Sequence, residues 1–316
     1  MNILANDGIS PSGLKALKEA GHTVYTDFIE ATNLEAFIKE NSIDGILVRS
    51  ATKVRKDLID ACPSLKFIGR GGVGMDNIDV EYGRNKGLAV FNTPAASSRS
   101  VAELVMGHLF AISRSLHHSN RAMPLEGAEN FKTLKKQYSK GRELRGKTLG
   151  IIGFGRIGRS LASYALGCGM KVIAHDRFAE NGEVEVNVGD ISISVDCQML
   201  SMEEVLKQSD AISLHIPAQA NGQAVIGSEQ LAMMKPGTIL LNAARGGVVD
   251  EDALIDALNS GQIFGAALDV FVSEPSPRAD ILAHPSISLT PHTGAATGEA
   301  QDRIGLELAA QIAELV

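Results

Sequence analysis

The sequence predicts an α/β protein with two doubly wound parallel-sheet domains. The chain has 316 residues, which is more than a single hydrophobic core comfortably serves, so two domains are expected. Short apolar runs of strand length alternate with helical patterns up to residue 93, and the same alternation starts again at residue 148. Strands that alternate with helices form parallel sheets, because each crossover helix returns the chain to the edge where the previous strand began. Each series therefore predicts a sheet of its own.

The elements of both domains follow from the positions of these apolar runs. Strands of the first domain are expected at residues 2–5, 23–26, 45–48, 65–68 and 88–91, with helices such as 12–20 and 34–40 between them. Strands of the second domain are expected at residues 148–152, 171–175, 211–216, 238–242, 265–270 and 287–290. Residues 181–198 alternate apolar and polar side chains around a Gly-Asp pair, which predicts a small additional hairpin without an assigned function.

A stretch of different character separates the two series. Residues 98–118 place apolar side chains on one helical face. Residues 119–146 contain Pro124, several glycines and no clear period, and so long a loop is unusual inside a compact domain. We expect this helix and the arm that follows it to pack on a second subunit of a homodimer; a mobile surface loop is the alternative.

Composition narrows the classes of partner. The formal net charge is −7, whereas nucleic acids and anionic membranes require a broad basic surface, so neither is expected as a partner. The three cysteines, Cys62, Cys168 and Cys197, form no CxxC pair and cannot all be bridged, which favours a reducing compartment. The first residues lack a signal-peptide pattern and no long apolar run occurs, so a cytoplasmic protein is expected. No metal site is predicted.

A glycine motif in the middle of the chain predicts a dinucleotide-binding site. The residues Gly153-Phe154-Gly155-Arg156-Ile157-Gly158 follow an apolar strand and precede a helical pattern. In such a motif the first glycine permits a tight turn, the second lets the backbone approach a pyrophosphate, and the third lets the helix pack on the strand. Asp176 follows the next strand, where a carboxylate binds ribose hydroxyls and repels a 2′-phosphate. NAD is therefore expected rather than NADP, although Arg177 beside it weakens that preference.

A second match to the same pattern, Gly69-Arg70-Gly71-Gly72-Val73-Gly74, lacks the accompanying acid. The next strand ends in Asn92-Thr93-Pro94 without a carboxylate. A glycine-rich turn after a strand still directs backbone N–H groups at a small anion. We assign this turn to the carboxylate of a substrate, with a purely structural tight turn as the alternative.

Three polar residues, Arg245, Glu274 and His292, stand on the loops after the last three expected strands. Ligands of open α/β sheets bind beyond the carboxyl ends of strands. Hydride transfer at a hydroxylated carbon needs a base for the hydroxyl proton, a cation for the adjacent carboxylate, and an acid that orients the base. His292, Arg245 and Glu274 fit these roles in that order, although each residue alone would pass for an ordinary loop or core side chain.

These blocks together resemble the D-isomer-specific 2-hydroxyacid dehydrogenase family along nearly the whole chain. Besides the glycine motif with Asp176, the matching segments are Asn242-Ala243-Ala244-Arg245-Gly246-Gly247-Val248-Val249-Asp250, Ala267-Leu268-Asp269-Val270-Phe271 with Glu274-Pro275, and Pro291-His292-Thr293-Gly294-Ala295. The resemblance implies a Rossmann NAD-binding domain inserted in a flavodoxin-like substrate domain. The substrate domain would comprise residues 1–93 and 286–316, including a returning C-terminal helix. The NAD-binding domain would comprise residues 94–285, with a dimerisation arm at about 98–146.

The resemblance also implies roles for individual residues. Arg245, Glu274 and His292 would form the catalytic set, with His292 as acid and base, and Asp269 would hold the nicotinamide carboxamide. The residues expected to bind the cofactor are Gly153, Gly155, Arg156, Ile157, Gly158, Asp176, His215, Pro217, Ala243, Asp269, His292 and Gly294. Those expected to bind substrate are Arg49, Ser50, Arg70, Val73, Gly74 and Arg245.

Within that family, the N-terminal run is most similar to the phosphoglycerate dehydrogenases. The residues that carry this similarity are Val48-Arg49-Ser50-Ala51-Thr52-Lys53-Val54, Gly69-Arg70-Gly71-Gly72-Val73-Gly74-Met75-Asp76-Asn77-Ile78-Asp79 and Asn92-Thr93-Pro94. The implied reaction is NAD-dependent oxidation of 3-phospho-D-glycerate to 3-phosphohydroxypyruvate, the first step of serine biosynthesis. Since the sequence ends at residue 316, no C-terminal regulatory domain is expected.

A phosphorylated substrate requires additional positive charge at the site. The candidates are Arg49, Arg70 and four lysines of the arm, namely Lys132, Lys135, Lys136 and Lys140, although such lysines also occur on ordinary solvated loops. One alternative is a glyoxylate/hydroxypyruvate reductase or another D-2-hydroxyacid dehydrogenase on the same scaffold. An alternative of a different class is a dinucleotide-sensing scaffold that resembles transcriptional corepressors.

Overall fold

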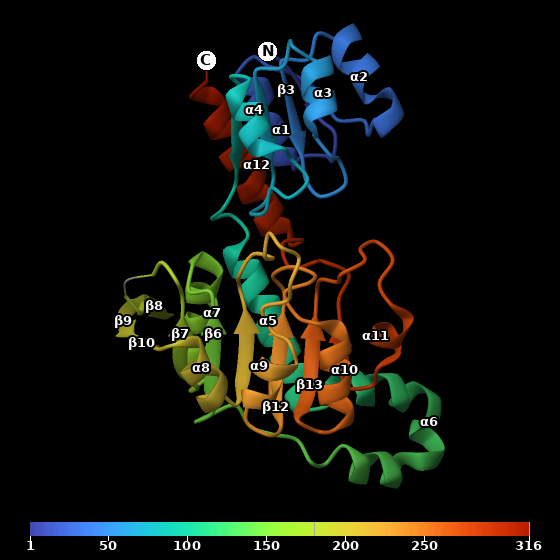
Figure 1. Ribbon diagram of the computed structural model, residues 1–316, viewed down its shortest axis with the longest axis vertical. Coiled ribbons are helices and arrows are strands. Elements are labelled where there is room, and N and C mark those ends of the chain that lie inside the picture. Colours follow the sequence, from blue (N-terminus) through green and yellow to red (C-terminus); the bar gives the residue numbers. More distant parts are fainter. Residues whose placement is uncertain (180, 316) are drawn as a thin grey trace. The chain divides into compact units, whose positions relative to one another are not determined.

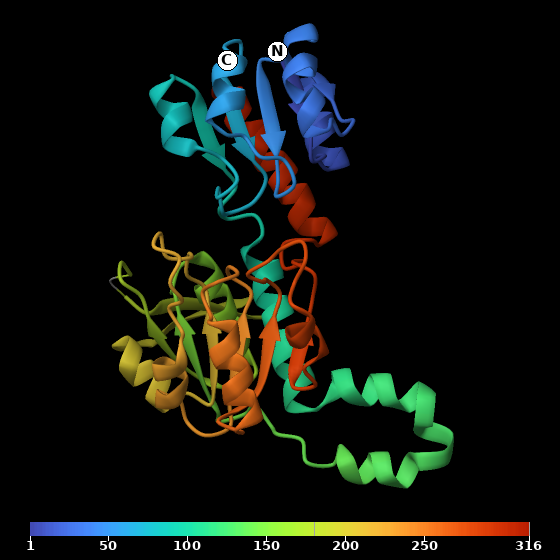
Figure 2. The same ribbon diagram turned by 45° about the vertical axis from the view of Figure 1, so that its right-hand side comes forward.

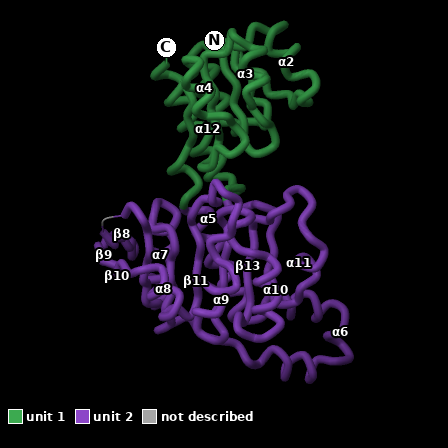
Figure 3. Tube along the Cα trace, in the orientation of Figure 1, with its two compact units in different colours: residues 1–98, 295–316 green, residues 99–294 purple. Residues whose placement is uncertain are grey.

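The structure, a computed structural model, describes residues 1–179 and 181–315 and divides into two units (Figure 3). Unit 1 comprises residues 1–98 and 295–316, and unit 2 comprises residues 99–294. Each unit has a parallel sheet of its own, which confirms the predicted fold class. Residue 316, the last of the expected substrate domain, lies outside the described residues.

Unit 1 is built round a five-stranded sheet in the order β2-β1-β3-β4-β5 (Figure 1). Its strands are β1 (Asn2–Ala5), β2 (Thr23–Tyr25), β3 (Gly45–Val48), β4 (Phe67–Arg70) and β5 (Ala89–Asn92). All neighbouring pairs are parallel, and the order is that of a flavodoxin-like sheet. Its helices are α1 (Pro11–Glu19), α2 (Ala31–Glu40), α3 (Lys56–Ala61), α4 (Val80–Asn85) and, from the other end of the chain, α12 (Gly298–Ala313).

The last helix belongs to the same core as the first strand. Ile304 and Leu308 of α12 are buried in one cluster with Ile3 of β1. Helices α1 and α12 meet at Gly13 and Gly305, where a Cβ atom built on Gly13 would lie 2.6 Å from the Cα atom of Gly305. Two residues without side chains therefore let these helices approach backbone to backbone.

Unit 2 contains a seven-stranded sheet in the order β10-β7-β6-β11-β12-β13-β14, with all neighbouring pairs parallel. Its strands are β6 (Thr148–Ile152), β7 (Lys171–His175), β10 (Gln198–Met199), β11 (Ala211–Leu214), β12 (Thr238–Asn242), β13 (Ile263–Leu268) and β14 (Ile287–Leu289). Its crossover helices are α7 (Arg156–Gly167), α8 (Met202–Gln208), α9 (Ser228–Met233), α10 (Glu251–Asn259) and α11 (Ala279–Ala283). This strand order is that of a Rossmann sheet.

The stretch between the two sheets is mostly helical, which corrects the expectation of a long irregular arm. The helix expected at 98–118 is broken, because Ser115 adopts a left-handed backbone (φ 51°) between α5 (Ser98–Ser113) and α6 (Leu116–Gln137). Helix α6 has no readable apolar period because most of its side chains are exposed, Leu134 being the buried one. Figure 2 shows α6 leaving the rest of unit 2 and folding back on itself. The kink lies at Asn130.

The small hairpin predicted within 181–198 is confirmed. Strands β8 (Glu183–Val188) and β9 (Ile191–Asp196) pair antiparallel, and Gly189 has φ 60° in the two-residue turn. Val184 and Val186 are buried in the cluster that also contains side chains of α7. The hairpin is therefore anchored on the same face of the sheet as the helix that follows the glycine motif.

Cys62, Cys168 and Cys197 are all free thiols. Among the described residues, no helix is both long and apolar enough to cross a membrane.

Candidate functional site

The glycine motif forms the turn between β6 and α7, and each glycine has a distinct steric role. Gly153 has φ 97°, and a Cβ atom there would collide with the carbonyl group of His215. A Cβ atom on Gly158 would collide with the carbonyl oxygen of Gly153, so the third glycine lets α7 pack on β6. Gly155 is the N-cap of α7 and has open space where a side chain would stand. The turn thus presents a helix N-terminus to an anion such as a pyrophosphate.

Asp176, directly after β7, is held by backbone N–H groups. Its Oδ2 atom accepts a hydrogen bond from the N–H of Phe154 (2.6 Å), inside the glycine motif. Its Oδ1 atom accepts from the N–H groups of Phe178 (2.7 Å) and Ala179 (3.0 Å). Burial acts to raise the pKa of this carboxyl group, but the three backbone donors outweigh it and bring the pKa below its usual value. An ionised carboxylate therefore stands beside the turn.

A pocket of about 240 Å³ opens beside the glycine motif, and its lining includes Gly153, Asp176, His215 and Pro217. The Nε2 atom of His215 lies 2.9 Å from Oγ of Ser213, while its buried Nδ1 atom has no hydrogen-bond partner among the described residues. Burial lowers the pKa of His215 to about 4, so its imidazole is neutral at pH 7. A glycine cradle, an acid suited to hydroxyl groups and an orphaned polar atom in one pocket fit the adenosine half of NAD.

Glu274 and His292 are brought into direct contact on the loops after β13 and β14. The Nδ1 atom of His292 lies 2.8 Å from Oε2 of Glu274. The other carboxylate oxygen, Oε1, accepts a hydrogen bond from the N–H of Phe271 (2.9 Å). Because an ionised carboxylate only accepts hydrogen bonds, this contact places a proton on Nδ1 of His292. His292 itself has φ 53°, a left-handed conformation that is uncommon for a residue with a side chain.

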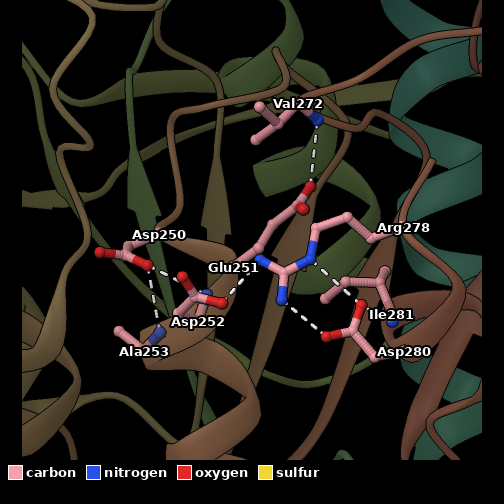
Figure 4. A network of polar contacts seen from close by, with 8 residues as sticks. All are labelled: Asp250, Glu251, Asp252, Ala253, Val272, Arg278, Asp280 and Ile281. Carbon is pink, nitrogen blue, oxygen red and sulfur yellow. Dashed lines mark hydrogen bonds and ion pairs between the residues drawn. The ribbon is translucent and has the colours of Figure 1, made fainter. Parts of the chain in front are cut away.

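A network of charged residues braces the loop that carries Glu274 (Figure 4). The buried Glu251, in the first turn of α10, accepts a hydrogen bond from the N–H of Val272 (3.0 Å). Arg278 forms ion pairs with Asp252 (2.7 Å) and Asp280 (2.6 Å), which join the far end of the loop to α10 and α11. Sequence reasoning missed this brace, because acids in the first turn of a helix are ordinary and their partners come from a distant loop.

Arg245 lies half-buried on the loop between β12 and α10. Its Nη1 atom donates to the carbonyl oxygen of Ala244 (2.6 Å), and Nδ2 of Asn242 donates to the carbonyl oxygen of Arg245 (3.0 Å). Since β12, β13 and β14 are neighbours in a parallel sheet, the loops of Arg245, Glu274 and His292 leave the same edge. The structure thus brings the three candidate catalytic residues to one edge of the unit 2 sheet, where Glu274 and His292 are in direct contact.

Asp269, at the end of β13, is buried and ties down the turn that contains His292. Its Oδ1 atom accepts hydrogen bonds from Oγ1 of Thr290 (2.7 Å) and from the N–H of Thr293 (2.8 Å). Its Oδ2 atom accepts from the N–H of Gly294 (2.9 Å). Three hydrogen bonds to one carboxylate therefore fix the backbone immediately after His292.

The residues expected to bind substrate, other than Arg245, belong to unit 1. They are Arg49 and Ser50 after β3, and Arg70, Val73 and Gly74 at and after β4. Nη2 of Arg70 donates to Oγ of Ser50 at 3.4 Å. These two strands are neighbours, so the two loops lie at one edge of the unit 1 sheet.

Two residues for which the sequence predicted no role clamp the loop at Arg49. Asp7 accepts hydrogen bonds from the N–H groups of Arg49 (2.6 Å) and Thr52 (3.1 Å). Asn77 donates from Nδ2 to the carbonyl oxygens of Arg49 (2.8 Å) and Thr52 (2.6 Å). Burial lowers the pKa of the Arg49 guanidinium and Asp7 opposes that effect. The group remains a cation, since arginine does not deprotonate in proteins.

The family of the chain follows from comparison with known proteins. Residues 106–294 match the family described as D-isomer specific 2-hydroxyacid dehydrogenase, NAD binding domain. A hydroxypyruvate reductase from Thermotoga maritima is 42% identical over 292 residues, which are 92% of this chain and 89% of that protein.

Two phosphoglycerate dehydrogenases are also similar over the whole chain. The D-3-phosphoglycerate dehydrogenase of Methanocaldococcus jannaschii is 40% identical over 321 residues, and that of Homo sapiens is 38% identical over 317. The matches cover 100% and 99% of this chain. The chain spans 57% and 56% of the length of these two relatives.

Solved structures of 2-hydroxyacid or glyoxylate oxidoreductases are also similar to this chain over nearly its whole length. A glyoxylate reductase from Paecilomyes thermophila has a TM-score of 0.82 at 28% identity, with 99% of this chain and 94% of that chain covered. A D-lactate dehydrogenase from Aquifex aeolicus, complexed with NAD and lactic acid, has a TM-score of 0.77 at 30% identity, with 100% and 95% covered. The chain therefore belongs to the D-isomer-specific 2-hydroxyacid dehydrogenase family of NAD-dependent oxidoreductases.

Proposed function

We propose that this protein interconverts a 2-hydroxy acid and its 2-oxo acid, with His292 as acid and base, Glu274 as its partner and Arg245 as the cation for the substrate carboxylate. The observation that carries the proposal is the 2.8 Å contact between Nδ1 of His292 and Oε2 of Glu274. Both residues lie on loops after the carboxyl ends of strands in an NAD-binding domain. When bound, NAD accepts the hydride in oxidation and returns it in reduction.

His292 is suited to take up and return one proton. Glu274 holds the proton on Nδ1, so Nε2 is the atom that removes the hydroxyl proton of a substrate. The Glu274 carboxylate then stabilises the imidazolium that results. Arg245 offers a planar fork for the substrate carboxylate and positive charge for the oxygen on which negative charge develops.

The variant His292→Asn tests this assignment, because it keeps a hydrogen-bonding side chain and removes the proton carrier. We expect kcat to fall by about 100-fold to 10,000-fold while NADH binding is retained. The control is His284→Asn, since His284 lies after α11 and contacts Asn259 instead of Glu274. Wild-type kcat in His292→Asn would refute the assignment. A wild-type protein that binds NADH but turns over no 2-oxo acid would instead favour the alternative of a dinucleotide-sensing scaffold, which needs no proton transfer.

We also assign the cofactor site to unit 2 and its specificity to Asp176. The glycine motif, with Arg156 and Ile157, would receive the pyrophosphate, and Asp176 would accept hydrogen bonds from the adenosine ribose. His215 and Pro217 would line the adenosine pocket. Ala243, Asp269, His292 and Gly294 would face the nicotinamide end.

Exchange of Asp176 for Asn removes the charge that repels a 2′-phosphate and keeps the size of the side chain. The ratio of kcat/KM for NADH to that for NADPH should fall by about tenfold or more, because charge repulsion of this kind is the basis of the discrimination. Arg177→Ala is the control and should not lower the ratio. An unchanged ratio in Asp176→Asn would remove Asp176 from the site.

For the substrate, we propose 3-phospho-D-glycerate, oxidised to 3-phosphohydroxypyruvate, as in the first step of serine biosynthesis. Similarity to two phosphoglycerate dehydrogenases supports this choice, and so do Arg49 and Arg70, two cations at one edge of the unit 1 sheet. The other candidate cations belong to the arm in unit 2, with Lys132, Lys135 and Lys136 in α6 and Lys140 after it. We assign Arg49, Ser50, Arg70, Val73 and Gly74 to substrate binding. Hydroxypyruvate is the second candidate, because the hydroxypyruvate reductase of Thermotoga maritima is 42% identical and matches over 89% of its own length.

Rates of NADH oxidation with phosphohydroxypyruvate, hydroxypyruvate and pyruvate distinguish these candidates. We expect the highest kcat/KM with phosphohydroxypyruvate. Arg70→Gln should raise KM for phosphohydroxypyruvate by about tenfold and should change KM for hydroxypyruvate much less, because a charge-assisted hydrogen bond to phosphate is lost. A higher kcat/KM with hydroxypyruvate would establish the second candidate.

We further propose that the protein is a cytoplasmic homodimer in which α6 contacts the second subunit. Four apolar side chains of α6 are exposed: Leu116, Met123, Leu125 and Phe131. Such an extended, apolar surface is unusual on a monomer and typical of a subunit contact. The free thiols support a reducing compartment.

A further inference from the structure

One buried titratable residue of unit 2 has no part in the proposed chemistry. His108 lies on α5 and is 7% exposed. Its Nδ1 atom is 2.9 Å from Oγ of Ser288, and its Nε2 atom is 3.0 Å from Oγ1 of Thr290. Ser288 belongs to β14, and Thr290 directly follows it. The imidazole therefore crosslinks a helix to the end of the strand that leads to His292.

The directions of these hydrogen bonds follow from the carboxylate at the end of the chain of contacts. Asp269 accepts a hydrogen bond from Thr290, whose single hydroxyl proton is thereby used. The Thr290 oxygen must then accept from Nε2–H of His108. Burial lowers the pKa of His108, so the ring carries one proton and its Nδ1 atom accepts from Ser288. The hydrogen bonds therefore run from Ser288 to His108, from His108 to Thr290 and from Thr290 to Asp269, which only accepts.

The turn at the end of this chain needs external support. His292 adopts a left-handed backbone with φ 53°, which costs free energy for a residue with a side chain. The N–H groups of the next two residues, Thr293 and Gly294, donate to Asp269. The conformation of His292 is thus maintained by a carboxylate whose own orientation depends on Thr290 and, through it, on His108.

We propose that His108 is a positioning residue for His292, acting as a fixed imidazole that orients Thr290 toward Asp269 and so holds the turn 290–294 in its reactive conformation. The inference rests on the proposed function of His292. His108 touches neither substrate nor cofactor in this scheme. Its contribution is to place the acid–base group, and a displacement of about 1 Å at a catalytic group is enough to reduce a rate by as much as 100-fold.

The kinetic test compares His108→Phe, which fills the space of the ring without hydrogen bonds, with His108→Gln, which retains one donor and one acceptor. We expect kcat of His108→Phe to fall by about tenfold and KM for the oxo acid to change less. His108→Gln should recover most of the lost rate. Ser113→Ala is the matched control, because Ser113 is also buried on α5 and has no hydrogen-bond partner at its Oγ among the described residues.

A double-mutant cycle shows whether the effect passes through Thr290. The kcat of the double variant His108→Phe/Thr290→Val should equal that of Thr290→Val alone, because both changes break one chain. Independent effects that multiply would overturn the proposal, and so would a wild-type kcat in His108→Phe. Folding of every variant is checked by the thermal midpoint.

Imidazole ¹⁵N spectra test the same proposal on the wild-type protein itself, and His108→Gln serves only to assign the resonance. We expect His108, assigned by the resonance missing from His108→Gln, to carry its proton on Nε2. A proton on Nδ1 would overturn the proposal. If His292→Asn retains full activity, the proposed function fails whatever the tautomer. If His292→Asn is inactive and His108→Phe is not impaired, the role of His108 alone is refuted.

Discussion

At the scale of single residues, His215 links the stability of unit 2 to pH. The backbone N–H of His215 donates to the carbonyl oxygen of Ile152 (2.7 Å), and its imidazole contacts the hydroxyl group of Ser213. Burial lowers the pKa of the folded-state imidazole to about 4 from an ordinary value of 6.5. The unfolded chain therefore takes up a proton between pH 6.5 and 4 that the folded chain does not, and the folded state loses stability as pH falls through this range.

We expect the wild-type protein to lose about 2 kcal/mol of free energy of unfolding between pH 7.5 and pH 5 through His215, because each pH unit below about 6.5 costs roughly 1.4 kcal/mol. Urea denaturation at the two pH values measures this loss. His215→Gln, which does not titrate here, should lose about 2 kcal/mol less over the same interval. A variant with the same pH dependence as the wild type would contradict this account. His284→Gln is the control.

At the scale of elements, the junction of β6 and α7 depends on one glycine far more than on another in the same helix. A Cβ atom on Gly158 would meet the carbonyl oxygen of Gly153, whereas one on Gly167, at the end of α7, would meet nothing within 4 Å. The close approach of Gly158 to Gly153 belongs to the turn proposed to receive the pyrophosphate. Gly167 has no neighbour that a methyl group would displace.

We therefore expect Gly158→Ala to lower the free energy of unfolding by about 1–3 kcal/mol and to raise KM for NADH, since the helix must move away from the strand. Gly167→Ala should be neutral or stabilising by up to about 1 kcal/mol, because alanine is the better helix former. Denaturation curves and NADH saturation of both variants make the comparison. Equal effects at the two positions would show that packing at Gly158 is not limiting.

The elements also show which features the sequence could predict. Apolar strands such as β6 and β12 were predicted within a residue or two, because burial on both faces of a parallel sheet requires a continuous apolar run. Helix α6 was missed because an exposed helix needs no apolar face. His108 and Glu251 were missed for a different reason: their significance depends on partners more than 20 residues away, which no local pattern reveals.

At the scale of the whole molecule, the exposed apolar side chains of α6 bear on assembly. Leu125 is 84% exposed and Phe131 is 56% exposed. Since a Glu at these positions would face the proposed partner, we expect Leu125→Glu/Phe131→Glu to convert a dimer into a monomer in sedimentation velocity experiments. Leu306→Glu, at a half-exposed apolar residue of α12, should leave the sedimentation coefficient unchanged. A wild-type protein that sediments as a monomer would rule out the dimer.

The return of α12 to unit 1 has a consequence for how the chain acquires its structure during synthesis. Ile304 and Leu308 complete the core that contains Ile3, yet they are made about 300 residues later. The first sheet therefore emerges with part of its apolar face uncovered, while all strands of unit 2 follow one another along the chain. Contacts between residues distant in sequence form late in folding. Unit 2, which binds the nucleotide in our proposal, can therefore finish folding before α12 completes the core of unit 1, although the strands of unit 1 are synthesised first.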